Sequence, residues 1–168
     1  MKNLFRFFIG LVLWFGTSVA FAEFNENNNA LLFNLGFTRG GMAVGVDFEH
    51  GARKTYGLGG YFRMYPDNTS PVADGITTFG GFIRPHFNRQ AWDFYVSPGF
   101  GLISYKPAAA GKSDETLFGP SFAIGLLYEL NPKMSFGAEE MSIYSWFGEH
   151  DYRGPLDQSL LAKFRFIF

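Results

Sequence analysis

Cysteine is absent from the 168 residues, which excludes a disulfide framework, a thiolate metal site and a lipid-modified cysteine behind a signal segment. Charge is scarce as well: charged residues make up 17% of the chain, with 14 basic residues against 15 acidic ones. A nucleic-acid-binding face needs clustered basic residues, so we expect no nucleic-acid partner. Long apolar runs are also missing after residue 22, and no later stretch is apolar enough to cross a membrane as a helix.

The one long apolar run lies at the N-terminus and has the layout of a secretory signal. Lys2 and Arg6 give a positive start, an apolar segment covers Phe7–Phe15, and Ala20-Phe21-Ala22 forms a small-x-small cleavage site. A retained membrane anchor is the alternative, but it would need about 20 apolar residues. We therefore expect residues 1–22 to be removed and residues 23–168 to form a single domain of 146 residues with a net charge of −3.

Aromatic residues are abundant, at 20% of the chain, yet the mean hydropathy is close to zero, at +0.01. This combination arises when apolar and polar positions alternate, and alternation with period two predicts half-buried strands. Eight segments show it, at about 30–38, 42–49, 55–65, 75–86, 91–104, 117–130, 133–146 and 160–168.

The connections between these segments are short at 50–54, 88–90 and 131–132, and longer at 66–74, 105–116 and 147–157. Only the first hairpin, Arg39-Gly40-Gly41, is tight where a longer loop is expected. Short turns at one end and longer loops at the other are typical of membrane barrels, which close with an even strand number because lipid cannot solvate an open edge. The sequence therefore predicts an all-β fold, an eight-stranded antiparallel up-and-down transmembrane β-barrel.

The last nine residues carry the clearest alternation, with Lys163 and Arg165 on the face opposite the aromatics. This segment resembles the C-terminal strand of bacterial outer-membrane β-barrel proteins, which end in Phe with aromatics two and four residues earlier. The resemblance implies that the barrel assembly machinery reads an apolar signal here, formed by Leu160, Phe164, Phe166 and Phe168.

Over residues 23–168 the chain is similar to small eight-stranded barrels of the OmpA/OmpX family. The resemblance implies a place in the bacterial outer membrane, in contact with lipid and lipopolysaccharide. The resemblance specifies fold and location far better than activity; we separately expect a monomer without a cofactor, and a non-enzymatic role in envelope integrity or surface interaction. Interfacial aromatic residues are expected near the strand ends: Tyr56, Trp92, Tyr105, Tyr128, Tyr144 and Trp146.

Segment 133–146 breaks the alternation. Strict alternation would place Glu140 on the lipid face and hide Met141 and Ile143 in the lumen. An acidic residue on the lipid face is unfavourable, so we predict a β-bulge at Glu139-Glu140 that turns Met141 and Ile143 outward. Regular strand pairing through these residues would refute the bulge.

Inward positions of the predicted strands carry charges of both signs. The acids are Asp47, Glu49, Asp93, Glu129 and one or both of Glu139 and Glu140; the bases are Arg63, Arg84, Lys163 and Arg165. An eight-stranded barrel is only wide enough for side chains to fill it, and buried charges are tolerated when they are paired. We therefore interpret this set as a structural charge network, in which the glutamate pair faces Lys163 and Arg165. A narrow ion path through the network is the alternative.

A lipid A-modifying outer-membrane enzyme, of the deacylase or acyltransferase type, is the main alternative function. It needs a serine activated by a histidine that a carboxylate orients. His50 and His86 are expected near the periplasmic end, and His150 in the last outer loop between Glu149 and Asp151. Neighbours on one loop do not converge as a triad or as a metal site, and the His-x-Ser-Asn pattern of the deacylases is absent. We predict no catalytic, cofactor or metal site. A soluble lipocalin-like carrier, with its apolar face inside, is a further alternative.

Overall fold

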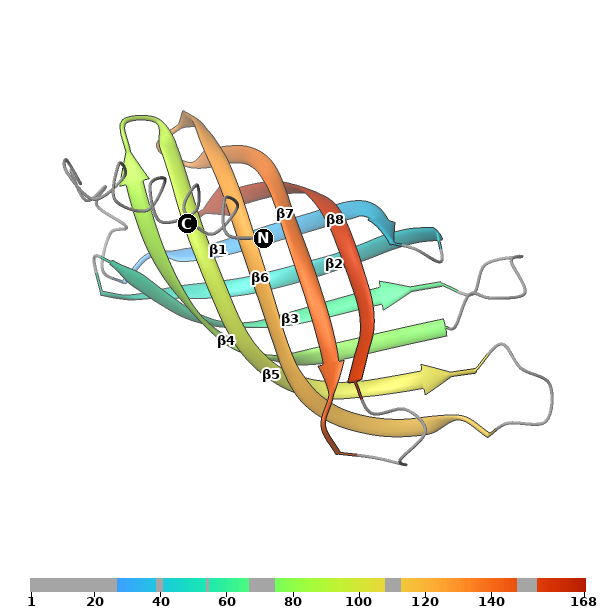
Figure 1. Cartoon of the computed structure of the whole chain (residues 1–168). Coiled ribbons are helices and arrows are strands. Elements are labelled where there is room, and N and C mark those ends of the chain that lie inside the picture. The colour runs from blue at the N-terminus through green and yellow to red at the C-terminus, as the bar shows by residue number, and fades with distance from the viewer. Residues whose placement is uncertain (1–26, 39–40, 54, 67–74, 108–112, 148–153) are drawn as a thin grey trace, which may run out of the picture.

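The computed structural model describes residues 27–38, 41–53, 55–66, 75–107, 113–147 and 154–168. In these ranges eight antiparallel strands close into one barrel, each paired with its neighbours in sequence and the last with the first (Figure 1). This confirms the predicted fold. The strands are β1 (Asn29–Thr38), β2 (Gly41–Arg53), β3 (Tyr56–Tyr65), β4 (Gly75–Arg89), β5 (Trp92–Lys106), β6 (Glu115–Asn131), β7 (Met134–Ser145) and β8 (Gly154–Ile167). No helix in the described ranges is long and apolar enough to cross a membrane.

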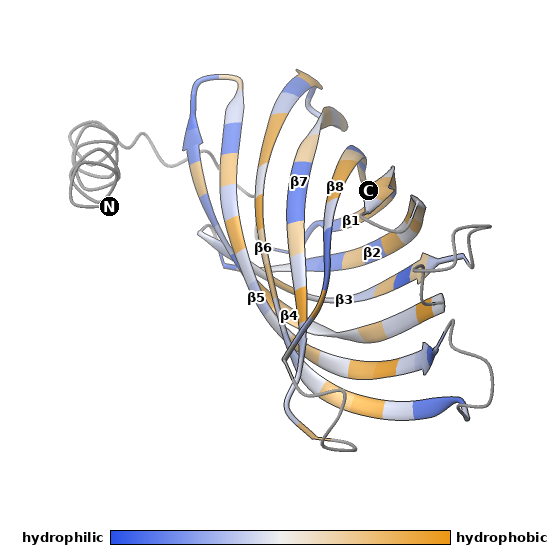
Figure 2. Cartoon of the chain, turned by 45° about the vertical axis from the view of Figure 1, so that its right-hand side comes forward, coloured by the Kyte–Doolittle hydropathy of each residue, from blue (hydrophilic) through white to orange (hydrophobic). Residues whose placement is uncertain are grey.

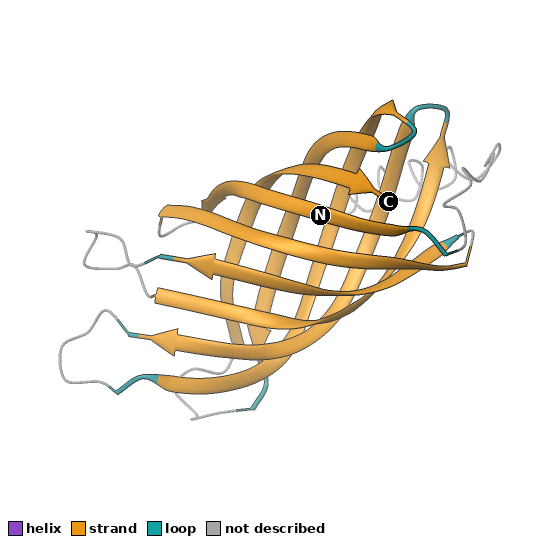
Figure 3. Cartoon of the chain, turned by 180° about the vertical axis from the view of Figure 1, so that it is seen from behind, coloured by secondary structure: helices purple, strands orange, loops and turns teal. Residues whose placement is uncertain are grey.

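The two ends of the barrel differ. At one end, here called the terminal end, the backbones of Asn29 and Phe168 exchange two hydrogen bonds of 3.0 and 2.9 Å and so complete the closure between β1 and β8. The short connections β2–β3, β4–β5 and β6–β7 lie at this end, and the longer ones lie at the opposite end, the loop end (Figure 3). The predicted signal segment 1–22, Arg39-Gly40 and the loop segments 67–74, 108–112 and 148–153 fall outside the described residues.

The outer surface of the barrel is apolar, and all eight strands contribute large exposed side chains to it. One from each strand, in order, is Phe33, Phe48, Leu58, Phe79, Leu102, Phe122, Phe136 and Phe164. Hydropathy alternates along the strands as the sequence predicts (Figure 2). A water-soluble protein would bury such a surface, whereas a barrel in lipid exposes it.

The interior has two layers. Toward the loop end it is an apolar core, whose buried side chains are Ala43, Tyr65, Ile76, Ile103, Tyr105, Leu117, Met141, Ile143 and Leu161, among others. Toward the terminal end it is charged, apart from a small apolar cluster of Ala30, Leu32, Tyr95 and Leu127. The lumen is therefore filled by side chains along its length.

The predicted bulge at Glu139-Glu140 is wrong. Pairing between β6 and β7 runs in regular register from Ser121↔Ile143 through Ile124↔Glu140 and beyond. Glu139 faces inward and Glu140 outward, while Met141 and Ile143 are only 3% and 1% exposed in the apolar core. Burial of these two side chains against the apolar inner layer at the loop end stabilises the barrel. A lumen that was polar along its whole length would not give this stabilisation. The register shift between β7 and β8 lies at Ile143/Tyr144 instead.

β8 begins at Gly154, six residues before the predicted start at Leu160, so residues 154–157 belong to the strand and not to the last loop. This part of β8 is held by backbone pairing with β7, and by a hydrogen bond from the Thr38 hydroxyl to the Asp157 carboxylate. Backbone pairing needs no apolar alternation, which is why the sequence pattern missed it.

The predicted interfacial aromatics lie on the outer surface, with one exception. At the terminal end Trp92 and Tyr128 pack edge to face with ring centres 4.9 Å apart. Tyr56, at the start of β3, is also at the terminal end and is half-buried. At the loop end Tyr144 and Trp146 are exposed. Tyr105, in contrast, is 8% exposed within the apolar core because it shares the inward phase of β5. Tyr105 is therefore not an interfacial residue.

Candidate functional site in the barrel lumen

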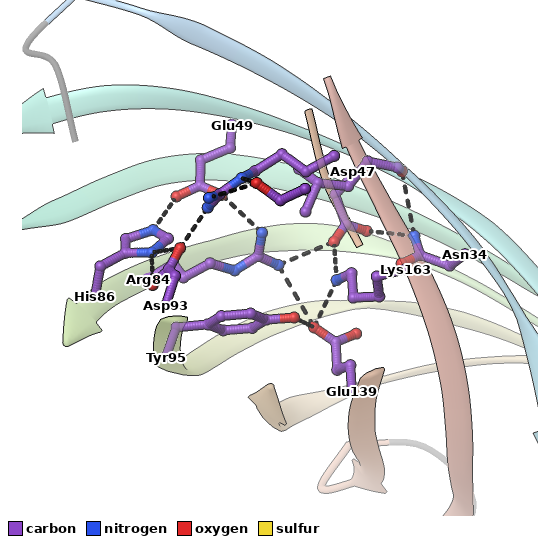
Figure 4. A network of polar contacts seen from close by, with 12 residues as sticks. Asn34, Asp47, Glu49, Arg84, His86, Asp93, Tyr95, Glu139 and Lys163 are labelled. Atoms are coloured by element: carbon purple, nitrogen blue, oxygen red, sulfur yellow. Dashed lines mark hydrogen bonds and ion pairs between the residues drawn. The ribbon is translucent and has the colours of Figure 1, made fainter. Parts of the chain in front are cut away.

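The charged layer of the lumen holds four carboxylates and four cations, all at most 2% exposed. They are Asp47, Glu49, Asp93 and Glu139, and Arg63, Arg84, Lys163 and Arg165. Their formal charges cancel, as expected where charges leave water. The close-up in Figure 4 shows that the network crosses the lumen, so that side chains from opposite walls of the barrel meet.

Asp47 on β2 is one centre of the network. It accepts hydrogen bonds from Arg63, from Arg84 Nη2 at 2.9 Å and from Lys163 Nζ at 2.7 Å. The Asn34 amide adds a bond of 3.2 Å from β1. One carboxylate thus contacts three cations that come from β3, β4 and β8.

Glu139 on β7 is the second centre. Lys163 Nζ donates to its Oε2 at 2.6 Å, Arg63 Nη2 donates to its Oε1 at 3.1 Å, and the Tyr95 hydroxyl donates to Oε2 at 2.9 Å. Lys163 therefore lies between the Asp47 and Glu139 carboxylates. Because each cation is shared, no buried charge depends on a single partner, which is the arrangement that lowers the cost of desolvation.

A second group lies nearer the terminal end. His86 Nε2 is 2.7 Å from Glu49 Oε1, and its Nδ1 is 2.9 Å from both Asp93 oxygens. Asp93 also accepts from Arg165, whose guanidinium donates to the Ser135 hydroxyl at 3.0 and 3.3 Å. Five strands (β2, β4, β5, β7 and β8) are tied together here.

Arg84 links the two groups. Its Nη1 donates to Glu49 Oε2 at 2.7 Å while its Nη2 donates to Asp47. The guanidinium carbon lies 4.1 Å from the Phe82 ring centre and 4.7 Å from the Tyr95 ring centre. A planar guanidinium can be held by two carboxylates and two aromatic faces at once, which a lysine ammonium could not match.

Glycines on the inner wall make room for the network. A Cβ atom on Gly57 would overlap the Glu49 carboxylate, and a Cβ on Gly125 would overlap the ring of Tyr95, its cross-strand partner. These two glycines thus permit large polar side chains to lie flat against the inner wall.

The structure brings together eight of the ten residues proposed for the charge network. Of the other two, Glu129 is half-exposed, with an oxygen 3.8 Å from Arg165 Nη2. Glu140 is the correction: it lies on the outer surface, where the Gln158 amide donates to its carboxylate. The expected pairing of Lys163 with a β7 glutamate is present through Glu139, whereas Arg165 bonds Asp93.

Sequence reasoning left Asn34, His86, Tyr95 and Ser135 out of the network. All four occupy inward positions of their strands, in phase with the charged residues of the network. The usable signal was therefore the strand phase together with hydrogen-bonding capacity, and not charge alone.

The surroundings of His86 differ from those of a catalytic histidine. Both ring nitrogens of His86 face carboxylates, whereas a catalytic triad keeps one histidine nitrogen for a hydroxyl nucleophile. His150 lies outside the described residues. Within the described part of the chain, no group of three or more His, Cys, Asp or Glu side chains is placed to hold a metal ion. A cavity of about 10 Å³ borders Arg63, Arg84 and Glu139, which is room for about one water molecule.

Comparisons with known proteins give a structural likeness without a sequence match. No family model matches the chain, and no curated protein matches it in sequence. The N-terminal β-barrel domain of Pseudomonas aeruginosa OprF is similar with a TM-score of 0.69 and 14% identity, over 85% of this chain and 98% of that one. Neisserial surface protein A is similar with a TM-score of 0.64 and 15% identity, over 84% and 95%.

A designed transmembrane β-barrel is also similar, with a TM-score of 0.55 and 14% identity, over 87% of this chain and 99% of that one. Sequence identities this low support a likeness in fold alone. The chain therefore has the fold of the eight-stranded outer-membrane β-barrels.

Proposed function

We propose that this chain is an integral, non-enzymatic protein of the bacterial outer membrane that contributes to envelope integrity or surface interaction. The observation that carries the proposal is the distribution of side chains across the barrel wall. Large apolar side chains of every strand point outward, and eight charged side chains are buried inside. Only a lipid environment makes this arrangement stable, because water would favour its reverse.

The difference between the two ends of the barrel supports one orientation in the membrane. In this proposal the terminal end, with its short turns, lies in the periplasm, and the loop end faces outward among lipopolysaccharide. The apolar core at the loop end and the charge network behind it fill the lumen. The filled lumen supports a structural role over the narrow ion path.

Migration of the protein on SDS gels tests the proposal. The detergent-extracted outer-membrane fraction should contain the protein, and its unheated band should shift on boiling because a closed barrel resists SDS until heated. The soluble periplasmic fraction serves as the comparison. A protein that is extracted without detergent and does not shift would overturn the membrane assignment and return the soluble carrier to consideration.

The proposed assembly signal faces outward at the end of β8. Phe164, Phe166 and Phe168 are 45%, 38% and 68% exposed, and Leu160 is 63% exposed. These side chains add little to the interior, so their role in the proposal is recognition by the barrel assembly machinery.

Replacing Phe168 with alanine should therefore lower the amount of assembled barrel in cells several-fold, while refolding of the purified chain into detergent stays unchanged. The backbone bonds between Asn29 and Phe168 do not depend on the ring. Phe37→Ala is the matched control, since Phe37 is an outward phenylalanine of 72% exposure at the other end of the barrel. An equal loss in both variants would show that exposed aromatic area, and not a C-terminal signal, governs assembly.

A further inference from the structure

The outer surface of the barrel carries a polar pair on β7 and β8. Glu140 is exposed there, and its carboxylate accepts a hydrogen bond from the Gln158 amide. Regular pairing with Ile124 on β6 and Leu160 on β8 fixes Glu140 in this outward phase. The hydrophilic stretch in β7 is visible in Figure 2.

The pair lies near the middle of the apolar band. Along the outward face of β7, Glu140 is four residues from Phe136 toward the terminal end and four from Tyr144 toward the loop end. At about 3.3 Å per residue on a strand tilted by about 40°, each interval spans about 10 Å along the barrel axis. Both intervals end in aromatic side chains, and Phe136 is paired across the ladder with Tyr128.

An ionisable side chain at this depth is costly in lipid and normally has a polar partner. Gln158 supplies only part of what is needed. The carboxylate has two oxygens that can each accept more than one bond, and the amide has two donor hydrogens and its own acceptor oxygen. The pair therefore has unused donors and acceptors directed toward lipid.

Both small and large side chains border this pair, and the large ones, Ile124 and Leu160, are the direct cross-strand partners of Glu140. Ala138 and Ala162 are cross-strand partners next to Glu140, and Ser142 is the cross-strand partner of Gln158. These small side chains let a second copy come near the polar atoms of the pair, as small residues do at interfaces between membrane segments. Leu160, 63% exposed, lies between Gln158 and Ala162 on β8 and is an apolar part of the same surface.

We propose that this surface, formed by Ala138, Glu140, Ser142, Gln158, Leu160 and Ala162, is the contact face of a two-fold symmetric dimer of this chain in the membrane. The inference rests on the proposed membrane location. A two-fold axis beside the pair brings the Glu140 carboxylate of each copy to the Gln158 amide of the other. A pair with one acceptor group and one donor group is complementary to itself under this operation.

This inference replaces the expectation of a monomer. With regular pairing, Glu140 reaches the lipid face, and association removes two carboxylates from lipid at one contact.

Cysteine crosslinking and sedimentation test the dimer in the full-length processed chain. The chain has no cysteine, so Ser142→Cys introduces one thiol, nearly isosteric with serine, on the proposed contact face. Oxidation in lipid vesicles should link this variant into dimers. Thr77→Cys is the matched control on β4, across the barrel from the proposed contact, and it should stay unlinked.

Sedimentation equilibrium in density-matched detergent should give the mass of two chains. Glu140→Leu and Gln158→Leu should each raise the dimer dissociation constant by about tenfold. This is the size expected for the loss of hydrogen bonds between two membrane-spanning segments. The heat-dependent gel shift must persist in both variants, which separates lost association from lost folding.

A single-chain mass at every concentration, or equal crosslinking of Ser142→Cys and Thr77→Cys, would overturn the dimer and leave the membrane assignment in place. Loss of the heat shift in the unsubstituted protein would instead overturn the membrane assignment itself.

Discussion

Replacing Asp47 with alanine should lower the free energy of unfolding by about 4 kcal/mol, the cost of removing one partner from a buried ionic network. Asp47 accepts hydrogen bonds from Arg63, Arg84 and Lys163, and all four side chains are at most 2% exposed. Without it, Arg63 and Lys163 share the single carboxylate of Glu139. The charged layer then carries one uncompensated positive charge away from water.

Urea unfolding of the refolded barrel in lipid vesicles, followed by tryptophan fluorescence, measures this change. Glu129→Ala is the matched control, because Glu129 is also an acid on the inner wall but is 39% exposed and 3.8 Å from Arg165. A solvent-accessible pair of this kind should contribute less than about 1 kcal/mol. Equal losses in the two variants would contradict a network held together by buried charge.

A second substitution separates charge from packing. Lys163→Met in the Asp47→Ala background restores charge balance and keeps an unbranched side chain of similar length. We expect the double variant to recover part of the stability lost by Asp47→Ala, since a neutral apolar replacement of a buried pair is often nearly neutral. If the two substitutions add their costs, the network stabilises the barrel through shape alone.

The sequence could predict which residues of this site face the lumen, because the alternation along each strand gives the direction of its side chains. Alternation placed Asp47, Arg84 and Lys163 on the inner wall because successive side chains of a strand point to opposite faces. It could not say that Arg84 reaches across β3 to Asp47, or that Arg165 bonds Asp93 and not a β7 glutamate. Those pairings depend on the stagger of the strands around the barrel, which no single strand encodes.

The error at Glu140 has a different physical source. The bulge was inferred from the cost of an acidic residue on the lipid face, with no account of what burial of Met141 and Ile143 contributes inside the barrel. The lumen is apolar toward the loop end, and burial of both side chains outweighs the cost of a carboxylate that is hydrogen-bonded to Gln158. Single-strand patterns cannot show that the lining changes character along the axis, since this follows from all eight strands together.

Gly125→Ala should lower the free energy of unfolding by about 3 kcal/mol, at the upper end of the cost of overpacking. The added Cβ would overlap the Tyr95 ring, which lies across the ladder on β5. Tyr95 is fully buried, so its ring cannot move aside into solvent. Any shift weakens its 2.9 Å hydrogen bond to Glu139 and its contact with the Arg84 guanidinium.

The same unfolding assay distinguishes this overlap from a general effect of replacing a strand glycine. Gly81→Ala is the matched control, because its Cβ would point outward and meet no atom closer than 3.6 Å. Since alanine has a lower conformational entropy when unfolded than glycine, this control should be neutral or slightly stabilising. In a Tyr95→Ala background the ring is gone, and Gly125→Ala should then cost almost nothing. A full cost that persists without the ring would mean that the glycine is required by the backbone of β6 and not by the side chain that covers it.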